Sequence, residues 1–355
     1  MRAVVLSGGE GSRLRPITHT QAKQLIPVGG TPILFHALGA IRDAGIDDVA
    51  IVVGPPNEDE VRTAVGDGGR WGIRITYVHQ PAPLGLAHAV LTAADFVRGE
   101  PFLLYLGDNV ILEGVTRFVR EFERTRPDAQ IFVARVPEPE RFGVVELDGD
   151  RVVRLVEKPK EFVSDLALVG VYLFDDSILE ACASLEPSWR GEYEITEAIQ
   201  WLVDRGASVR VEMLEGWWKD TGKPDDLLEA NRMLLSLATP SLQGEVDAAT
   251  SVEGVAVVGP GAKVTRSRLV GPVVIGANAI VEDSTLGPDV SLEPGCEIVG
   301  SVIRDSILME GCRVVGVDEL TGSLLGRNVD VEMRGQAASR RHRLVVGDQS
   351  RLEVD

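Results

Sequence analysis

Short apolar runs alternate with amphipathic segments over the first two thirds of the chain. Thr31 is suited to cap a helix that has Pro32 at its first position, and the segments that begin at Pro32 and Leu86 repeat their apolar side chains at helical spacing, which predicts amphipathic helices between strands. Strands that alternate with helices in this way predict a mostly parallel sheet. The runs predicted as buried strands are Ala3–Leu6, Val49–Val53, Ile73–Val78, Phe102–Leu106 and Ile131–Arg135.

After about residue 140 the pattern changes to alternating segments, among them Val152–Val156 and Leu168–Phe174. This change predicts antiparallel strands added to the sheet. A last helical pattern, Asp225–Leu237, runs into Thr239 and Pro240, where we expect a domain boundary. The first domain is therefore predicted to contain residues 1–238.

Beyond this boundary the chain repeats a six-residue pattern in which an aliphatic residue is followed by glycine. Clear copies begin at Val258, Ile275 and Leu286, and weaker ones at Leu292 and Leu325. Such hexapeptides are typical of a β-helix, in which the aliphatic side chains point inward. At about eighteen residues per coil, residues 245–335 would form about five coils. The predicted fold is an α/β, Rossmann-like, mostly parallel mixed sheet followed by a left-handed parallel β-helix. The second domain, residues 239–355, would contain this β-helix and a C-terminal tail.

Charge and cysteine content restrict the function further. The net charge of −18 argues against nucleic acid as a partner. Cys182, Cys296 and Cys312 have no metal-ligand or CxxC spacing, so we expect structural thiols in a reducing compartment. The N-terminal apolar run is too short for a signal sequence, and no stretch is long enough to span a membrane. A cytoplasmic protein without a membrane partner is predicted.

A glycine-rich loop follows the first predicted strand, at the edge where open α/β sheets bind ligands. It reads Leu6-Ser7-Gly8-Gly9-Glu10-Gly11-Ser12-Arg13-Leu14-Arg15-Pro16. Its glycines allow backbone N–H groups to approach phosphate oxygens, and Arg13 adds a fixed positive charge. Leu14 replaces the third glycine of a dinucleotide fingerprint, and the Gly-Lys-Ser/Thr end of a Walker A loop is missing. Although a plain tight turn is the alternative, the nearby Lys23 favours phosphate binding.

Residues 1–235 resemble the sugar nucleotidylyltransferase family. The resemblance lies in the loop Gly8-Gly9-Glu10-Gly11-Ser12-Arg13-Leu14 and in Lys23-Gln24-Leu25-Ile26-Pro27. Lys-Gln at the second motif is similar to the thymidylyltransferases within that family, and the hexapeptide tail resembles their long form. The resemblance implies transfer of a nucleotidyl group from dTTP to glucose-1-phosphate, which yields dTDP-glucose and pyrophosphate.

The resemblance also implies which residues carry the reaction. Arg13, Lys23 and Asp108 would be catalytic, and Asp108 would share a Mg²⁺ ion with Asp220. Hard carboxylate oxygens suit this ion. A turn aspartate after a strand is the alternative for each. The residues implied in nucleotide binding are Leu6, Gly8, Gly9, Gly11, Ser12, Gln80, Pro81 and Gly85.

Gln80 offers a donor and an acceptor that can match N3–H and a carbonyl of thymine. His88, one helical turn beyond Gly85, is predicted to be packed rather than catalytic. Phe142 stands where relatives often have tyrosine, which removes a hydroxyl. The residues implied in binding the sugar phosphate are Gly143, Glu157, Lys158, Val169, Gly170 and Glu194.

The implied reaction needs no general base, because a sugar phosphate is already an anion. Catalysis would consist of alignment and charge neutralisation. Three alternatives remain: UTP or another sugar as substrate, a second acyltransferase activity in the β-helix, and a non-catalytic nucleotide-sugar sensor. Residues 243–335 contain no histidine that could act as an acyltransferase base. We expect the β-helix to be structural and to offer a surface for homo-oligomer formation.

Overall fold

The computed structural model describes residues 1–333 and 340–354, and the chain forms two compact units. The sheet unit contains Met1–Glu10 and Leu34–Asp220. The coil unit contains Gly11–Ile33 and Thr221–Asp355, so the second half of the glycine-rich loop groups with the C-terminal part. The domain boundary after residue 238 stays a prediction. Among the described residues, no helix combines the length and the apolar character needed to cross a membrane.

The sheet unit is built on one mixed sheet. Its strands are β1 (Arg2–Ser7), β4 (Asp48–Val53), β5 (Arg74–His79), β6 (Phe102–Leu106), β8 (Ala129–Arg135), β9 (Gly143–Asp148), β10 (Arg151–Glu157), β11 (Leu166–Phe174) and β12 (Val209–Met213). The order is β10-β9-β11-β6-β1-β4-β5, with β8 beside β11 and β12 beside β8. Strands β6, β1, β4 and β5 are parallel, and β11 is antiparallel to β6, β8 and β9. The predicted mostly parallel mixed sheet with an antiparallel addition is confirmed.

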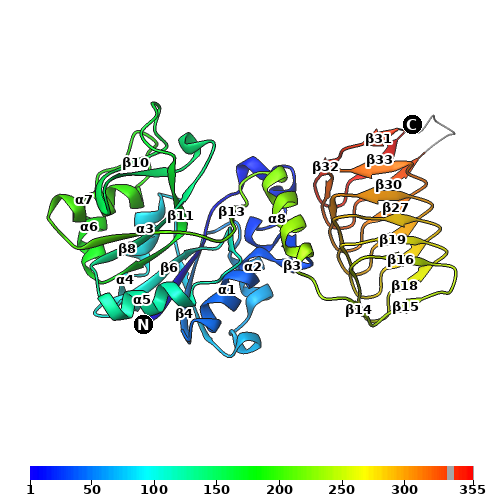
Figure 1. The fold of residues 1–355 in the computed structure, drawn as a ribbon, viewed down its shortest axis with the longest axis horizontal. Coiled ribbons are helices and arrows are strands. Elements are labelled where there is room, and N and C mark those ends of the chain that lie inside the picture. Colours follow the sequence, from blue (N-terminus) through cyan, green and yellow to red (C-terminus); the bar gives the residue numbers. More distant parts are fainter. Residues whose placement is uncertain (334–339, 355) are drawn as a thin grey trace. The chain divides into compact units, whose positions relative to one another are not determined.

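Helices and short elements connect these strands (Figure 1). The α-helices are α1 (Ile33–Asp43), α2 (Glu58–Val65), α3 (Leu86–Thr92), α4 (Ala94–Val97), α5 (Thr116–Thr125), α6 (Ser177–Ala183) and α7 (Ile195–Asp204). The remaining elements of the sheet unit are the two-stranded ladder of β7 (Asn109–Ile111) with β13 (Trp218–Asp220) and the 3₁₀ turns η4 (Gly69–Trp71) and η5 (Pro139–Arg141).

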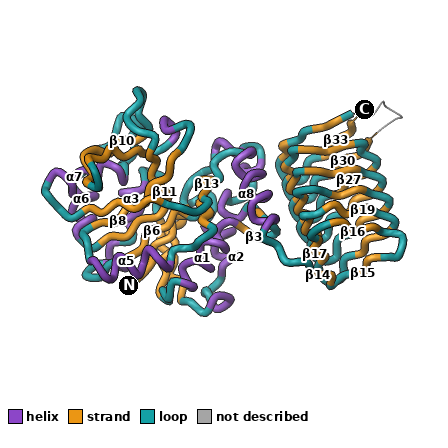
Figure 2. The backbone as a smooth tube through the Cα atoms, viewed as in Figure 1, coloured by secondary structure: helices purple, strands orange, loops and turns teal. Residues whose placement is uncertain are grey.

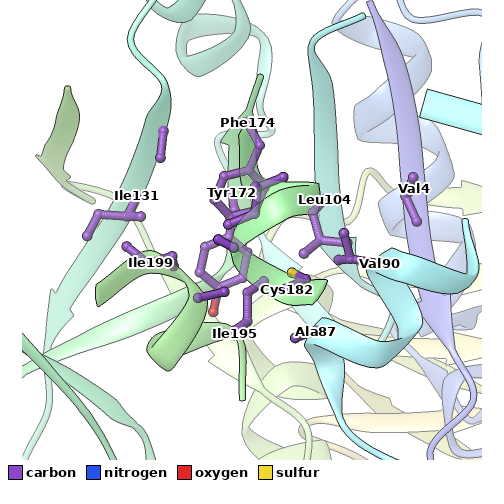
Figure 3. Close-up of a cluster of buried hydrophobic side chains, with 14 of the residues drawn as sticks. Val4, Ala87, Val90, Leu104, Ile131, Tyr172, Phe174, Cys182, Ile195 and Ile199 are labelled. Atoms are coloured by element: carbon purple, nitrogen blue, oxygen red, sulfur yellow. The ribbon is translucent and has the colours of Figure 1, made fainter. Parts of the chain in front are cut away.

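The core of this unit lies where α3, α6 and α7 pack against the sheet. Figure 3 shows Val90 of α3 next to Leu104 of β6, and the same buried cluster contains Ala87 of α3 and Tyr172 of β11. Removing such side chains from water stabilises the unit by about 25 cal/mol per Å² of apolar surface. This packing fixes the sheet from which the candidate site projects.

Two details of the predicted sheet and helices are wrong. Strand β5 is half-exposed rather than buried, because it forms the edge of the sheet and pairs only with β4. Thr31 and Pro32 do not begin a helix. They form strand β3 (Thr31–Pro32), which pairs with β2 (Pro27–Val28) as a hairpin, and α1 begins at Ile33.

The coil unit contains a β-helix of three parallel sheets, as predicted (Figure 2). The first sheet contains β14 (Ser241–Leu242), β17 (Ala256–Val258), β20 (Val273–Ile275), β23 (Val290–Leu292), β26 (Ser306–Leu308), β29 (Leu324–Leu325) and β32 (Val345–Val346). The second contains β15 (Glu245–Val246), β18 (Lys263–Thr265), β21 (Ile280–Glu282), β24 (Glu297–Val299), β27 (Arg313–Val315), β30 (Asp330–Met333) and β33 (Arg351–Val354). The third contains β16 (Ser251–Glu253), β19 (Arg268–Val270), β22 (Thr285–Leu286), β25 (Val302–Arg304), β28 (Glu319–Thr321) and β31 (Arg341–His342).

The coils differ from the prediction in pitch and in extent. Register partners Lys263, Ile280, Glu297 and Arg313 recur every 16 or 17 residues rather than about eighteen. Strands continue past residue 335 to Val354, so the left-handed β-helix is longer than the predicted coils. Residues 334 and 335, at the end of the predicted stretch, lie outside the described part of the chain.

The remaining elements of the coil unit are held against the β-helix by polar contacts. They are η1 (Ser12–Leu14), η2 (Ile17–His19), η3 (Lys23–Leu25), the β2–β3 hairpin and α8 (Pro224–Ser236). The buried Asn231 of α8 accepts hydrogen bonds at Oδ1 from the Gly29 N–H at 2.8 Å and the Ser291 hydroxyl at 2.7 Å. Nearer the loop, the Thr20 hydroxyl donates to Asp348 at 2.8 Å. The segment that carries Arg13 and Lys23 is therefore braced by α8 and the last coil.

Candidate active site

The predicted site residues are distributed over both units. Gly11, Ser12, Arg13 and Lys23 belong to the coil unit. The sheet unit contains the others, namely Leu6, Gly8, Gly9, Gln80, Pro81, Gly85, Asp108, Gly143, Glu157, Lys158, Val169, Gly170, Glu194 and Asp220.

In the sheet unit, the first glycines of the loop pack where β1 and β4 end. A Cβ on Gly8 would lie 3.1 Å from Gln80 Oε1 and 3.5 Å from the Gly54 nitrogen, so this position has little room for a side chain. The Asn57 amide donates to the Gly9 carbonyl oxygen at 3.1 Å. Since Gln80 directly follows β5, the parallel strands bring it to the same edge as the loop.

In the coil unit, the second half of the loop forms a compact turn. Gly11 has a φ of +63°, and a Cβ there would lie 2.9 Å from Thr18 and 3.1 Å from Lys23 Cβ. The Thr18 hydroxyl donates to the Gly11 carbonyl oxygen at 2.7 Å. Arg13 lies over Gly222, where a Cβ would come within 2.7 Å of its Nη2 atom. Gly222 follows Asp220 by two residues in the chain.

Arg13 also lines an open hollow of about 750 Å³ within the coil unit. Four of the lining side chains are cationic, and Asp225 is the single anion, which forms an ion pair with Arg343. An excess of positive charge around a hollow favours polyanionic ligands. The lining residues are Arg13, Arg15, Pro16, Lys223, Pro224, Asp225, Arg343 and Val345.

The two predicted metal ligands lie on neighbouring backbone segments of the sheet unit. Strand β13 pairs with β7 so that Asp220 is opposite Asn109, the residue after Asp108. Asn109, which the sequence analysis did not single out, is buried and donates to Asp108 Oδ1 at 2.9 Å. Its own Oδ1 accepts from the Trp218 indole at 2.5 Å. Neighbouring strands in antiparallel register thus place both carboxylates at one end of the ladder.

Gly170 is required by the same arrangement. A Cβ on Gly170 would lie 2.6 Å from the Asn109 side chain, so only glycine allows Asn109 this close to β11. The register of β11 against β8 shifts between Leu168 and Tyr172, on either side of Gly170. Such irregularities are common next to active sites, where they redirect the backbone.

A half-buried network of charges lies among the residues predicted to bind the sugar phosphate. Arg190 Nη1 lies 3.1 Å from Glu194 Oε1 and 3.6 Å from Glu157 Oε1, and Lys158 Nζ lies 3.6 Å from that same Glu157 oxygen. A Cβ on Gly143 would lie 2.9 Å from Glu157 Oε2, which leaves that position open only to glycine. The sequence analysis did not identify Arg190 as a site residue, because no periodic pattern marks the segment that contains it.

Glu157 is destabilised as an anion despite these cations. Burial raises the pKa of its carboxyl, the charge of Lys158 lowers it, Glu194 raises it, and the net shift is upward. The charge of Asp108 affects the neighbouring Tyr105. Burial is the larger cause that raises the pKa of the Tyr105 hydroxyl, and the negative charge of Asp108 raises it further. A buried carboxyl with a raised pKa beside other charged side chains is typical of functional sites.

Comparison with known proteins identifies the family of the chain. The model of a family described as nucleotidyl transferase matches residues 2–236. The chain belongs to this family. A glucose-1-phosphate thymidylyltransferase of Streptomyces griseus is 50% identical over 355 residues, which cover 100% of this chain and 99% of the relative. The resemblance to sugar nucleotidylyltransferases and to their long form is thereby confirmed.

Two further relatives of this nucleotidyl transferase differ in substrate name and in length. A UTP–glucose-1-phosphate uridylyltransferase of Haloferax volcanii is 38% identical over 246 residues, which cover 68% of this chain and 100% of that relative. A solved structure described as a glucose-1-phosphate thymidylyltransferase of Bacillus anthracis, in complex with a sucrose, is 34% identical with a TM-score of 0.64. It covers 68% of this chain and 98% of that chain.

The raised pKa of Glu157 gives a prediction for stability. A carboxyl whose pKa is higher in the folded state than in the unfolded chain stabilises the fold below its ordinary pKa. This contribution is lost as pH rises through the folded value. Glu157→Gln does not titrate, so its melting temperature relative to the unsubstituted protein should increase as pH rises from about 4 to 8. Calorimetric melting curves over this pH range measure the difference. A difference that falls with rising pH would contradict the upward shift.

Proposed function

We propose that the protein is a Mg²⁺-dependent glucose-1-phosphate thymidylyltransferase. The observation that carries this proposal is the 50% identity to the Streptomyces griseus thymidylyltransferase over essentially the full length of both chains. The chain contains the cationic residues to which the proposal assigns phosphate contacts, namely Arg13, Lys23 and Lys158. The products would be dTDP-glucose and pyrophosphate.

The reaction is a displacement at phosphorus. A phosphate oxygen of glucose-1-phosphate would attack the α-phosphorus of dTTP and form a new P–O bond. The bond from the α-phosphorus to the bridging oxygen of the β-phosphate would break, and its electrons would leave with pyrophosphate. The attacking oxygen is already ionised, so the protein has only to align two anions and reduce their repulsion.

On the nucleotide side, we assign the leaving pyrophosphate to Arg13 and to the N–H groups of the loop Gly8–Ser12. The planar guanidinium can hold two phosphate oxygens at once. Lys23 would contribute its charge as the two phosphates approach. Gly11 supports this assignment because it packs close to Lys23 Cβ and is itself held by the Thr18 hydroxyl, which fixes where the Lys23 side chain begins.

On the sugar side, Glu157 and Glu194 would accept hydrogen bonds from sugar hydroxyls, and Lys158 would pair with the sugar phosphate. The fit is supported by the space that Gly143 leaves beside Glu157. Val169 and Gly170, both buried on β11, would line the ring. Arg190 holds Glu194 and contacts Glu157, which keeps two carboxylates together in a buried site.

The carboxylates at the end of the β7–β13 ladder fit a Mg²⁺ ion. Mg²⁺ commonly takes one or two protein carboxylates and completes its octahedron with substrate phosphates and water. Asp108 and Asp220 supply such a pair. Among the described residues, no cluster of three or more Asp, Glu, His or Cys side chains could hold a metal. When bound, the ion would neutralise charge on the transferred phosphoryl group.

The alternatives are weaker. UTP remains an alternative substrate because a 38% identical relative is named for it. An acyltransferase in the β-helix would need a base on the coils. Since the coils extend to Val354, His342 does lie on them, but it is in register with the inward-facing Leu320. Its side chain therefore points into the coil interior. A nucleotide-sugar sensor would not need the full set of Arg13, Lys23, Asp108 and Asp220.

We also propose a cellular location and an oligomeric state for the enzyme. Its substrates are phosphorylated metabolites, so we place it in the cytoplasm without nucleic-acid or membrane partners. The first coil exposes Leu242 and Val252, and the next coils expose Ile280. These apolar positions support homo-oligomer formation through the β-helix.

A scan of nucleoside triphosphates tests the activity. With glucose-1-phosphate and Mg²⁺, dTTP should give the highest kcat/KM for pyrophosphate release among dTTP, UTP, CTP, GTP and ATP. A preference for CTP, GTP or ATP would overturn the assignment. A preference for UTP would keep the reaction and correct the nucleotide.

The metal assignment is tested by Asp108→Asn. The substitution keeps the size of the side chain but removes an anionic ligand, and we expect kcat to fall by roughly 10²–10³. Calorimetry should show weaker Mg²⁺ binding in the presence of nucleotide. Asp148→Asn, at an exposed position on β9, is the control and should change neither quantity. Normal Mg²⁺ binding by Asp108→Asn would remove Asp108 from the site.

The cationic hollow gives a prediction for the last coil. If the hollow attracts the pyrophosphate product, Arg343→Ala should raise its inhibition constant by about threefold to tenfold, because one of four cations is lost. Asp225→Asn removes the only anion and should lower that constant. Arg341→Ala is the control, since this side chain is exposed and pairs with Glu319 on the neighbouring coil. Equal effects of Arg343→Ala and Arg341→Ala would show that only net charge matters.

A further inference from the structure

The side-chain amide of Gln80 is held between two acceptors. Gln80 is 5% exposed, and its Nε2 lies 2.9 Å from His88 Nδ1 and 3.4 Å from the Gly85 carbonyl oxygen. An amide nitrogen has two hydrogens, so these two acceptors can use both. The amide oxygen Oε1 lies on the side of Gly8, where no Cβ intervenes. The oxygen is therefore the group that Gln80 offers to a ligand.

The two acceptors are themselves fixed by Tyr193. A Cβ on Gly85, which has a φ of +107°, would come within 2.5 Å of the Tyr193 carbonyl oxygen. The Tyr193 N–H donates to the Leu84 carbonyl oxygen at 2.8 Å, and the Ala87 N–H donates to the Tyr193 carbonyl oxygen at 3.0 Å. The His88 ring stacks on the Tyr193 ring with 6.3 Å between centroids. The position of His88 is thus set by the segment that precedes α7.

We propose that His88 is a positioning residue that determines which bases the site accepts. The inference rests on the proposed function, in which Gln80 faces the base. The Gly85 carbonyl can only accept, so it fixes the amide nitrogen of Gln80 on its side, and His88 Nδ1 then accepts the second amide hydrogen. Rotating the Gln80 amide by 180° would turn its oxygen toward the Gly85 carbonyl oxygen and His88 Nδ1, and acceptors in contact are unfavourable. His88, the closer of the two partners, therefore helps to keep the amide in one orientation.

This orientation discriminates between pyrimidines. Thymine and uracil carry a hydrogen on N3, which can donate to Gln80 Oε1. Cytosine has a bare N3 acceptor, which would meet the same oxygen without a hydrogen between them. A free Gln80 amide could rotate and serve either base, so an oriented amide rejects cytosine where a rotating one would not. A site that leaves polar groups unpaired rejects the wrong substrate strongly.

The test compares dTTP with dCTP in two variants of His88. Phenylalanine keeps a ring against Tyr193 but has no acceptor. His88→Phe should lower the ratio of kcat/KM for dTTP to that for dCTP by about fivefold to tenfold, the range expected for one lost hydrogen bond. The KM for glucose-1-phosphate should not change. In His88→Asn, the amide oxygen can take the place of Nδ1, so the ratio should return to within about threefold of the original.

Other outcomes are equally informative. An unchanged ratio in a folded His88→Phe protein, or a loss in His88→Asn as large as in His88→Phe, would overturn the proposal and leave His88 with a packing role. His88→Leu, a second variant without an acceptor, replaces His88→Phe if the latter melts below the assay temperature. Failure of the unsubstituted enzyme to use dTTP or UTP would instead overturn the proposed function itself.

Discussion

The candidate site depends on the parallel pairing of β1 with β4 and β6. Parallel strands end at the same edge of a sheet, so segments that follow different strands meet there although they are far apart in the chain. The loop after β1, Gln80 after β5 and Asp108 after β6 all reach this edge. The Gly107 N–H donates to the Leu6 carbonyl oxygen at 3.0 Å and extends the pairing beyond the regular strands. Without this register, the residues proposed for base, phosphate and metal binding would not converge.

Much of this arrangement could be predicted from the sequence. Apolar runs such as Phe102–Leu106 indicate buried strands, because only continuous apolar segments suit a sheet covered on both faces. Glycines in the loop indicate a close backbone approach, and the hexapeptides indicate a β-helix. Where pairing with a distant segment determines the secondary structure, the local sequence pattern predicts the wrong element. Thr31 and Pro32 have the chemistry of a helix start, but they pair with Pro27 and Val28 in a hairpin that Asn231 holds through Gly29.

The parts of the site that could not be predicted are contacts between side chains distant in sequence. Nothing in the segment around Arg190 indicates that its guanidinium contacts both Glu157 and Glu194. Asn109 could have been noticed at the end of a strand, but its bond to the Trp218 indole depends on the β7–β13 ladder. The extent of the β-helix was missed for another reason. Its last coil begins at Arg341, after the six-residue pattern has been interrupted in the sequence.

The grouping of Gly11–Ile33 with the coil unit changes how the β-helix should be viewed. A β-helix added only for assembly would have no reason to contact the loop that carries Arg13. Here Thr20 bonds Asp348 of the last coil, and a Cβ on Gly347 would lie 3.0 Å from the Pro16 carbonyl oxygen. Rigid support would matter for the phosphate contact proposed for Arg13, because small displacements weaken electrostatic stabilisation of a transition state. Under the proposed function, the coils would therefore affect the chemistry by holding the loop rather than by supplying a catalytic group.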